Sequence, residues 1–361
     1  MHKPRILLIS AYDAQSHRYW HQQLISGLPQ FKWQLLTLKD RYFSWRMGGN
    51  AMSFQQQSDT ELSADYDVVL ATSMTDLSTL LALYPHLNPA RKLLYFHENQ
   101  FAYPVNNKQQ GLAEMQLRSI YAAMVADVLV FNSQFNRDSF ISGVGAFIKK
   151  MPDGTPADLP QRLKAKAQLL PVPIRDDARP IQQQTDNNKK PCLEVIWNHR
   201  WEHDKGPETL LELLRLCRGH EQIKFHILGQ QFKQTPPAMQ SIIDAHRDQC
   251  LNLGYVEDRD AYLAILQRAD VVLSTAQHDF QGIAMLEAVA CGCLPVAPDR
   301  LVYPEYYPPE NLYPSATPKQ QAQSILALLL KPQNLAAAVV DLGWQKLKPM
   351  YADLLGGSHA E

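Results

Sequence analysis

The feature that most constrains the fold is a repeated alternation of short apolar runs with segments of helical periodicity. The apolar runs are rich in Val, Ile and Leu, which is typical of parallel strands that are buried on both faces. In the first half of the chain they lie at 5–10, 31–38, 66–72, 92–98 and 127–133. This pattern predicts a doubly wound α/β domain.

A second series of the same kind follows a polar run at 175–191 that shows no apolar period. Its apolar runs lie at 192–199, 223–229, 250–255, 270–276 and 293–298. We therefore expect two Rossmann-like domains facing a central cleft, because ligands of such sheets bind at the carboxyl ends of the strands. The predicted division is a first domain over 1–178, a linker over 179–191, a second domain over 192–335 and a helical tail over 336–361.

The composition is that of an ordinary globular protein, with 45% hydrophobic and 20% charged residues among 361. No apolar run reaches the ~18 residues of a membrane span, so we expect no membrane partner. The five cysteines are odd in number and form no CxxC pair, which favours reduced thiols and a cytoplasmic protein. The net charge of −1 does not by itself indicate a polyanionic partner, and no obligate protein partner is indicated.

The stretch HDFQGIAMLEAVACG at 278–292 joins a strand to a helix through a turn that contains Gly282. The N–H groups of Ile283 and Ala284 open this helix, and the start of a helix is a favourable place for a phosphate. Glu287 lies one turn further, inside an apolar helical run. It has two interpretations: an acceptor for sugar hydroxyls, as acidic residues hold ribose in other α/β folds, or the buried partner of an arginine.

The stretch WNHRWEHDKGPETLLELL at 197–214 also leads from a strand into a helix, with Pro207 in the first helical turn. Arg200 and Lys205 lie in the connecting loop. Two cations at the carboxyl end of a sheet suit a diphosphate, because Arg forks to two oxygens and Lys supplies a point charge. The alternative is a solvated loop in which Lys205 is an ordinary surface residue.

In the first half, the strand within YFHENQFAYP ends in His97 and Glu98, and Asn99 follows in a polar and aromatic loop. Ser16 and His17 open the helix after the first strand, at the same expected sheet edge. We expect His97 to face the cleft. The alternative is a histidine that is hydrogen-bonded at the end of its strand.

Segment 41–62 interrupts the alternation, because it is polar, basic and aromatic and too long for an ordinary connection. We interpret it as a functional loop. Its cations Arg41 and Arg46 and the indole of Trp45 are the side chains that such a loop would offer to a ligand. The alternative is a solvated basic face.

Two aspartate pairs resemble metal-binding motifs but fit structural roles better. Asp65 and Asp67 precede a strand, at the sheet edge opposite the expected cleft. Asp258 and Asp260 fit the cap and first turn of a helix. No His/Cys cluster accompanies either pair, so we expect no metal.

The spacing from Asp279 through Gly282 to Glu287 resembles the signature of the retaining family 4 glycosyltransferases, which have the GT-B fold. Arg200 and Lys205 match the phosphate-binding pair of that family. The stretches YFHENQ, VADVLVFNSQFN, RWEHDKGPE, GIAMLEAVACGCLP and LVYPE resemble tRNA-queuosine mannosyltransferases more specifically. The resemblance extends from the first strand to about residue 332.

This resemblance implies transfer of mannose from GDP-mannose to the cyclopentene-diol of queuosine in the anticodon of tRNA-Asp, with retention and with no metal or other cofactor. His97 and Asp279 would contact the transferred sugar as the catalytic residues. The implied donor-binding residues are Arg200, Lys205, Gly229, Gly282, Ile283, Ala284 and Glu287. The implied acceptor-binding residues are Ser16, His17, Arg41, Trp45, Arg46, Glu98 and Asn99.

The chain departs from the family pattern at two places. Asp279 stands where the family usually has Glu, and Ala14 and Gln15 stand where glycines usually precede Ser-His. The first change concerns the geometry of the sugar contact, and the second concerns the conformation of the acceptor loop.

Three other functions stay open. A glycosyltransferase with another nucleotide sugar, or with a lipid or glycan acceptor, would share the donor site, although no clear basic amphipathic helix favours membrane docking. A nucleotide-sugar epimerase would not need the HENQ and RWEHDK stretches. A tRNA-binding protein with a decayed transferase site is the non-enzymatic alternative, and binding of GDP-mannose would distinguish it.

Overall fold

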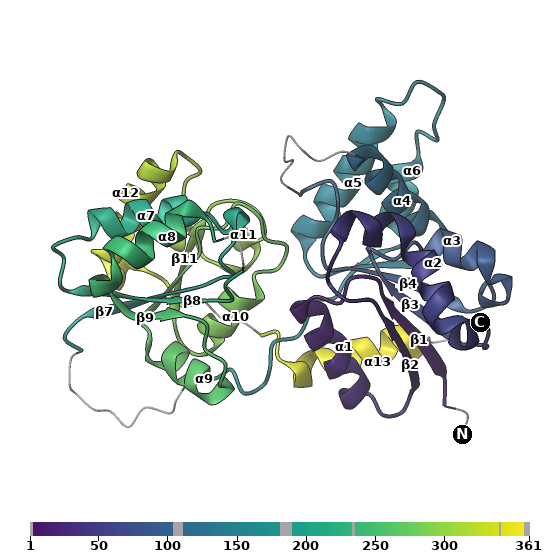
Figure 1. Cartoon of the computed structure of the whole chain (residues 1–361), viewed down its shortest axis with the longest axis horizontal. Coiled ribbons are helices and arrows are strands. Elements are labelled where there is room, and N and C mark those ends of the chain that lie inside the picture. The colour runs from purple at the N-terminus through teal and green to yellow at the C-terminus, as the bar shows by residue number, and fades with distance from the viewer. Residues whose placement is uncertain (1–2, 104–110, 181–189, 233–234, 339–340, 357–361) are drawn as a thin grey trace. The chain divides into compact units, whose positions relative to one another are not determined.

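The structure is a computed structural model that describes residues 3–103, 111–180, 190–232, 235–338 and 341–356. The chain divides into two compact units, and each consists of one sheet covered by helices (Figure 1). The first unit contains Met1–Pro173 and Trp344–Glu361, and the second contains Ile174–Gly343. The chain therefore enters the second unit once and returns from it once.

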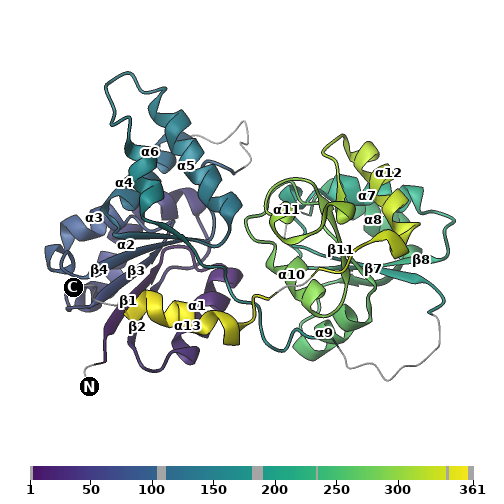
Figure 2. The same cartoon turned by 180° about the vertical axis from the view of Figure 1, so that it is seen from behind.

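The sheet of the first unit has six strands in the order β2-β1-β3-β4-β5-β6, and all of its pairings are parallel. The strands are β1 (Arg5–Ser10), β2 (Lys32–Thr37), β3 (Val68–Thr72), β4 (Arg91–Phe96), β5 (Val128–Phe131) and β6 (Ala167–Leu169). The helices are α1 (Gln15–Gly27), α2 (Phe43–Leu62), α3 (Leu77–Leu83), α4 (Leu112–Val125), α5 (Gln134–Ile148), α6 (Leu159–Ala165) and α13 (Trp344–Gly356). Helices α2 to α6 share one hydrophobic core with the sheet, whereas α1 and α13 lie together outside that core (Figures 1 and 2).

Helix α13 joins the first unit although it lies at the end of the chain. The indole N–H of Trp20 donates to the hydroxyl of Tyr351 at 3.0 Å, and that hydroxyl donates to the backbone oxygen of Pro171 at 2.9 Å. The Tyr351 hydroxyl also lies 3.2 Å from that of Tyr95. These buried bonds hold α13 against α1 and the end of β4, where His97 follows.

Segment 41–62, which the sequence pattern predicted to be a loop, instead forms helix α2 with a break at Ser58. Its buried face includes Met47, Ala51 and Phe54, which recur at helical spacing. Two adjacent glycines and exposed aromatic side chains obscure this period in the sequence. The burial of three apolar side chains against the sheet outweighs the low helix propensity of the glycines.

The second unit repeats the architecture, with strand order β12-β11-β10-β7-β8-β9 and parallel pairings throughout. Its strands are β7 (Leu193–Asn198), β8 (Ile223–Leu228), β9 (Cys250–Gly254), β10 (Val271–Leu273), β11 (Leu294–Pro298) and β12 (Leu312–Tyr313). Its helices are α7 (Pro207–Leu216), α8 (Pro237–Ala245), α9 (Arg259–Arg268), α10 (Ile283–Ala290), α11 (Tyr303–Tyr306) and α12 (Pro318–Leu329). The doubly wound α/β architecture predicted for both halves is thereby confirmed.

Several simpler expectations can also be compared with the structure. All five cysteines are free. Within the described ranges, none of the helices combines the length and the hydropathy that crossing a bilayer requires. Most of the predicted linker, residues 181–189, lies outside the described part of the chain. The chain crosses between the units at 173/174 and 343/344, where Ile174 and Gly343 form a parallel bridge.

Candidate functional site

The second sheet has a topological switch point at β7, because β8 and β9 continue from it on one side while β10 lies on the other. In open α/β sheets ligands bind at such a point, outside the carboxyl ends of the strands. The loop after β7 carries Arg200 and Lys205, and the loop after β10 carries Asp279 and Gly282. The four candidates are therefore brought to one edge of one sheet.

Backbone contacts tie these two loops together. The Thr275 hydroxyl donates to the backbone oxygen of Lys205 at 2.7 Å, and the N–H of Gln277 donates to that of Asp204 at 2.8 Å. Gly206 has a φ of +64°, and a Cβ there would lie 2.1 Å from the backbone oxygen of Thr275. Only glycine fits this close approach, which fixes the position of Lys205 relative to the second loop.

The side chain of Lys205 is nearly buried and reaches across to the second loop. Its Nζ donates to the backbone oxygen of His278 at 2.7 Å and lies 3.1 Å from a carboxylate oxygen of Asp204. A carboxylate oxygen of Asp279 lies 3.9 Å away. The ammonium group is thus held at a defined point between the two loops. A fixed point charge of this kind can bind an anion.

Asp279 holds the turn that opens α10. One of its oxygens accepts from the N–H of Gly282 at 2.9 Å, and the other accepts from the hydroxyl of Tyr303 at 3.2 Å. Burial raises the pKa of Asp279, but Lys205, His199 and the Gly282 N–H together outweigh it, so the pKa lies below its ordinary value. Asp279 is therefore an ionised carboxylate, and Gly282 supplies the left-handed φ of +70° before the helix.

Arg200 is more exposed than Lys205. Its guanidinium donates to Glu202 at 2.9 Å, and about half of its side chain is accessible. Burial raises the pKa of Glu202, although Arg200 opposes this change. Arg200 can turn towards a ligand at the cost of one partly exposed ion pair, which is typically worth no more than about 1 kcal/mol.

Glu287 lies in α10 with 14% of its side chain exposed, and the structure pairs it with an arginine. Arg259, at the start of α9, donates to Glu287 at 2.8 Å and to Asp177 at 2.7 Å. Burial raises the pKa of Glu287, with Arg259 opposing the shift. The two interpretations of Glu287 are compatible, because Arg259 occupies Oε1 of a carboxylate that has two oxygens.

His199 is a site residue that the sequence pattern did not reveal. It directly follows β7, is buried, and its Nε2 has no hydrogen-bond partner among the described residues. Burial and the nearby Lys205 lower the pKa of His199 to about 4, against the opposing effect of Asp279. Gly229, at the end of β8, has a φ of +146°, and a Cβ there would lie 1.8 Å from the backbone oxygen of His199. The only sequence signal was its place between a strand end and Arg200.

The depressed pKa of His199 predicts a pH-dependent stability. Unfolded histidine binds a proton near pH 6.5, whereas folded His199 does so only near pH 4. The stabilising contribution is therefore present above about pH 6.5 and is lost as the pH falls towards 4. In the parent protein the free energy of unfolding should fall by about 3 kcal/mol over this pH range because of His199. The His199→Gln variant should not show this fall. Urea titrations of both proteins would measure this, and identical pH profiles would contradict it.

In the first unit, His97 follows β4 at the carboxyl edge of the sheet. It is buried, and its ring contacts those of Trp20 and Tyr95, with centroids 4.8 and 4.7 Å away. The ring of His17 stacks on it at 4.0 Å. Burial lowers the pKa of His97 well below its ordinary value, and His17 and His21 add to this effect. His97 is therefore neutral at pH 7, and its Nε2 has no partner among the described residues.

Two carboxylates orient the histidines of α1. Glu98 lies 3.2 Å from Nε2 of His17, and Asp13 lies 2.9 Å from Nε2 of His21. Asp13 and His21 were not among the sequence-derived candidates, because their pairing depends on how the loop after β1 folds back on α1. Ser16 is exposed in the first turn of the same helix.

Of the remaining acceptor candidates, two are buried and hydrogen-bonded within the protein, and two are exposed to solvent. Asn99 is buried and donates to Asn136 and Ser139 while its oxygen accepts from the N–H groups of Phe101 and Ala102. Contact with a ligand would require Asn99 to release these bonds. Arg46 is also buried, and its Nε donates to the backbone oxygen of Lys39 at 3.2 Å. Arg41 and Trp45, in contrast, are exposed.

The aspartate pairs have the structural roles that the sequence predicts. Asp67 accepts from the N–H of Arg5 at 2.7 Å, at the start of β1. Asp258 caps α9 by accepting from the N–H of Ala261 at 2.7 Å. In the part of the chain that the structure describes, no group of three or more His, Cys, Asp or Glu side chains is placed to hold a metal ion.

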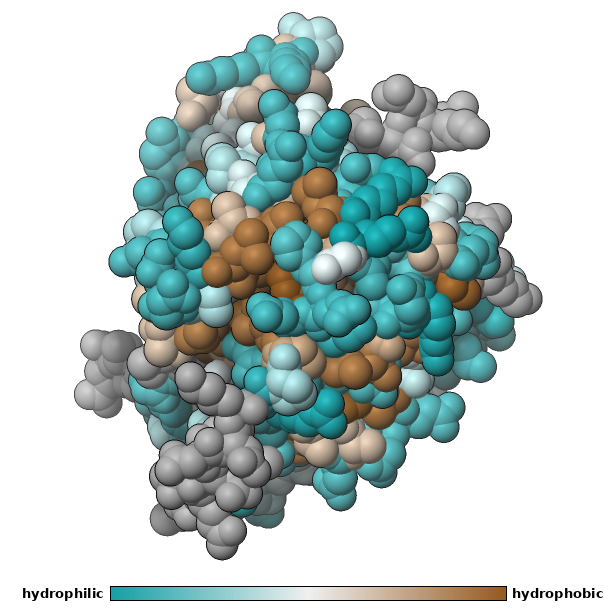
Figure 3. Space-filling view, turned by 90° about the vertical axis from the view of Figure 1, so that its left-hand side faces the viewer, coloured by the Kyte–Doolittle hydropathy of each residue, from teal (hydrophilic) through white to brown (hydrophobic). Residues whose placement is uncertain are grey.

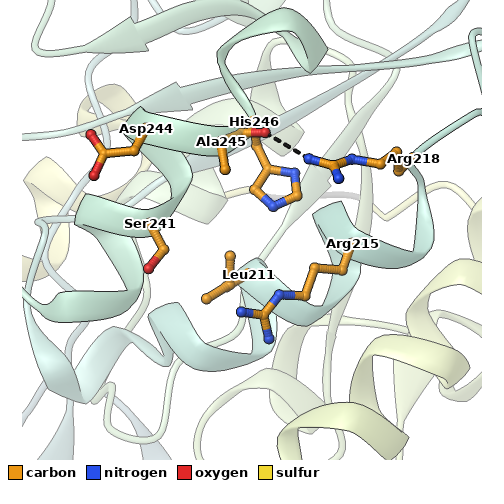
Figure 4. Close-up of a pocket in the computed structure, with 7 residues that line it drawn as sticks. All are labelled: Leu211, Arg215, Arg218, Ser241, Asp244, Ala245 and His246. Carbon is orange, nitrogen blue, oxygen red and sulfur yellow. Dashed lines mark hydrogen bonds between the residues drawn. The ribbon is translucent and has the colours of Figure 1, made fainter.

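A cavity of about 410 Å³ lies elsewhere in the second unit, between α7 and α8 (Figure 4). Because these helices run back to the starts of β8 and β9, their C-terminal ends lie away from the strand carboxyl ends. Arg218, which lines the cavity, donates to the backbone oxygen of Ala245 at 3.0 Å. The cavity does not belong to the switch-point site.

The outer face drawn in Figure 3 is largely hydrophilic, with hydrophobic residues gathered near its middle.

Comparisons with known proteins identify the family of the chain. The family model for the N-terminal part of tRNA-queuosine alpha-mannosyltransferases matches residues 5–174, and that for group 1 glycosyl transferases matches residues 178–341. A tRNA-queuosine alpha-mannosyltransferase of Drosophila melanogaster is 36% identical over 320 residues, which cover 86% of this chain and 84% of the relative. The chain belongs to the tRNA-queuosine alpha-mannosyltransferase family. It is therefore a glycosyltransferase.

Solved structures place this mannosyltransferase family member among GT-B folds. Sucrose-phosphate synthase from Thermosynechococcus elongatus is similar with a TM-score of 0.67 and 13% identity, covering 98% of this chain and 100% of that one. Anabaena HepE in complex with UDP and glucose has a TM-score of 0.65 and 16% identity, with coverage of 98% and 99%. At such identities the likeness shows the fold alone.

Proposed function

We propose that this protein transfers mannose from GDP-mannose to the cyclopentene-diol of queuosine in the anticodon of tRNA-Asp, with retention at the anomeric carbon. The observation that carries the proposal is the 36% identity to the fly mannosyltransferase over most of both chains. The positions of Lys205, Asp279 and Gly282 at one switch point support it, because a nucleotide-sugar donor needs an anion site at that edge.

In this proposal the second unit binds the donor. Lys205 and Arg200 neutralise the diphosphate, and the N–H groups at the start of α10, after Gly282, face its oxygens. Glu287 accepts from the ribose hydroxyls through the oxygen that Arg259 does not occupy. Asp279 contacts the mannose hydroxyls. Asp279 also holds the α10 turn by accepting from the N–H of Gly282.

The transfer that we propose uses no protein nucleophile. The acceptor hydroxyl attacks the anomeric carbon on the face from which the diphosphate departs, through an oxocarbenium-like transition state. The departing phosphate oxygen takes the proton of that hydroxyl. Lys205 and Arg200 stabilise the charge that develops on the diphosphate, so catalysis is mostly positioning and electrostatics.

We propose that the first unit binds the acceptor and the sugar. His97 is neutral at pH 7, so it can hydrogen-bond to a sugar hydroxyl without adding charge. Glu98 orients His17 beside it at 3.2 Å. The exposed Arg41 and Trp45 lie in the same unit and suit the phosphates and bases of an anticodon loop.

A transfer assay tests the proposal directly. Purified protein is incubated with queuosine-containing tRNA and, separately, with GDP-mannose, GDP-glucose, UDP-glucose and UDP-N-acetylglucosamine, and the released nucleosides are analysed by mass spectrometry. We expect queuosine to gain one hexose only with GDP-mannose, and tRNA that lacks queuosine to gain none. Transfer from a UDP-sugar alone would contradict the proposed donor, and transfer to tRNA without queuosine would contradict the proposed acceptor.

A further inference from the structure

The start of helix α2 presents two aromatic rings to solvent. Tyr42 is 69% exposed and Trp45 is 51% exposed, although large aromatic side chains usually bury most of their surface. Tyr42 also has a left-handed φ of +56°, one of two such non-glycine residues in the described chain. Strained backbone of this kind tends to occur at functional sites, because the surrounding structure must maintain it.

The indole of Trp45 is seated on the backbone of its own helix. A Cβ at Gly49 would lie 2.7 Å from Cζ2 of Trp45 and 2.8 Å from Cε2 and Cη2. The ring therefore covers the place where every other amino acid carries a side chain, and Gly49 is buried beneath it. The adjacent Gly48 is exposed, and a Cβ there would meet nothing within 4 Å.

One exposed cation lies beside this seat. Arg41 is exposed and follows Asp40, whereas Arg46 is buried and donates to the backbone oxygen of Lys39. The guanidinium of Arg41 lies 5.3 Å from the centre of the Tyr42 ring, which is a cation–π contact at the surface. An exposed aromatic face beside a cation is complementary to a nucleobase with its phosphate, whereas an acidic or purely apolar partner would match only part of it.

The seat also lies near the proposed acceptor edge. Phe43, the first residue of α2, packs edge-on against Tyr12, with ring centroids 5.7 Å apart. Tyr12 belongs to the loop between β1 and α1, and the N–H of the next residue, Asp13, donates to Leu38 after β2. The loop that leads to His17 and the start of α2 are thus in direct contact.

We propose that Trp45, seated on Gly49, is a stacking platform for an unpaired base that neighbours the reacting nucleotide, and that Arg41 beside Tyr42 contacts the RNA backbone. This inference rests on the proposed tRNA acceptor and deepens it by naming the contact. Its role is to hold an unpaired loop so that the reacting nucleotide can reach the edge where His17 and His97 lie. Sequence-specific recognition of RNA typically uses such unstacked bases on aromatic rings.

The two neighbouring glycines provide a matched test. Gly49→Ala places a methyl group under the ring and displaces it, whereas Gly48→Ala adds the same methyl group, with the same helix propensity, into open space. We expect Gly49→Ala and Trp45→Ala each to raise the Kd of queuosine-containing tRNA about tenfold, the effect of losing one stacked base. Gly48→Ala and Trp45→Phe should stay within about threefold of the parent protein. Fluorescence anisotropy with labelled tRNA measures the Kd.

Two further readouts separate the loss of stacking from misfolding and from the loss of a charge. The Kd of GDP-mannose, measured by titration calorimetry, should be the same in all variants, which also shows that they are folded. The slope of log Kd for tRNA against log salt should be unchanged in Trp45→Ala but reduced by about one in Arg41→Ala, because only the second change removes a phosphate contact.

The outcomes distinguish this inference from the proposed function. If the parent protein binds tRNA and modifies queuosine while Trp45→Ala and Gly49→Ala bind as tightly as Gly48→Ala, the platform is wrong and the acceptor stands. If the parent protein does not bind tRNA at any salt concentration, the proposed acceptor is wrong. Weakening by Gly48→Ala equal to that by Gly49→Ala would also overturn the platform, because the effect would not depend on the Trp45 ring.

Discussion

Replacing Lys205 by methionine is expected to lower kcat for mannosyl transfer by at least about tenfold, through the loss of about 2–4 kcal/mol of transition-state stabilisation. Methionine keeps most of the apolar stem of the side chain and removes only the charge. The effect should be large because the ammonium group is nearly buried and held by His278 and Asp204. It therefore acts on the developing charge without first being ordered. Initial rates at saturating GDP-mannose and tRNA measure the change.

A matched control for Lys205 is Lys224, which lies in β8 and donates to the backbone oxygen of Asp248 at 3.2 Å. This contact is at the start of β9, away from the switch point. Lys224→Met should keep the parental kcat. A Lys205→Met variant that turns over like the Lys224→Met variant would refute the assignment of Lys205 to the diphosphate.

Replacing Gly229 by alanine should destabilise the second unit and abolish nucleotide binding. A Cβ at this position would lie 1.8 Å from the backbone oxygen of His199, and the φ of +146° is one that L-residues rarely adopt. Backbone, unlike the end of a flexible side chain, cannot move away without shifting the end of β7. We expect the free energy of unfolding to fall by about 3 kcal/mol or more. Urea unfolding and calorimetric titration with GDP measure the two effects.

Gly219 is the control for this substitution, because it also has a left-handed φ, +93°, but a Cβ there would meet nothing within 4 Å. Gly219→Ala shares the backbone strain and lacks the collision. It should lose less stability than Gly229→Ala and should bind GDP normally. Equal losses in the two variants would show that the contact between β8 and the loop after β7 does not shape the site.

Most strands could be located from the sequence, because a parallel strand buried on both faces is a continuous apolar run. β1 was predicted residue for residue at 5–10. β6 and β12 were missed, since both are very short and β6 is largely exposed, so neither has an apolar pattern to detect. Helix α2 was misinterpreted because Gly48 and Gly49 and the exposed aromatic residues hide its buried period.

Some residues of the candidate site could likewise be placed from the sequence, and others could not. Arg200, Lys205 and Gly282 could be placed at one sheet edge from the sequence, because each lies in the loop after a strand and the carboxyl ends of parallel strands share an edge. His199 could not be recognised, because its pKa is lowered first by burial in the folded chain and then by the nearby charge of Lys205. Sequence spacing carries no information on such distances.

By itself, the sequence determined two doubly wound sheets, the loops that carry the cations and the glycine turn, and a family resemblance, because all of these depend on local periodicity and spacing. Only the tertiary structure decided that Arg259 shares the Glu287 carboxylate, that Trp45 rests on Gly49, and that α13 returns to the first unit to support Trp20. These contacts join segments or faces whose pairing depends on burial and hydrogen bonding in the folded chain. Local propensity is too weak to decide them.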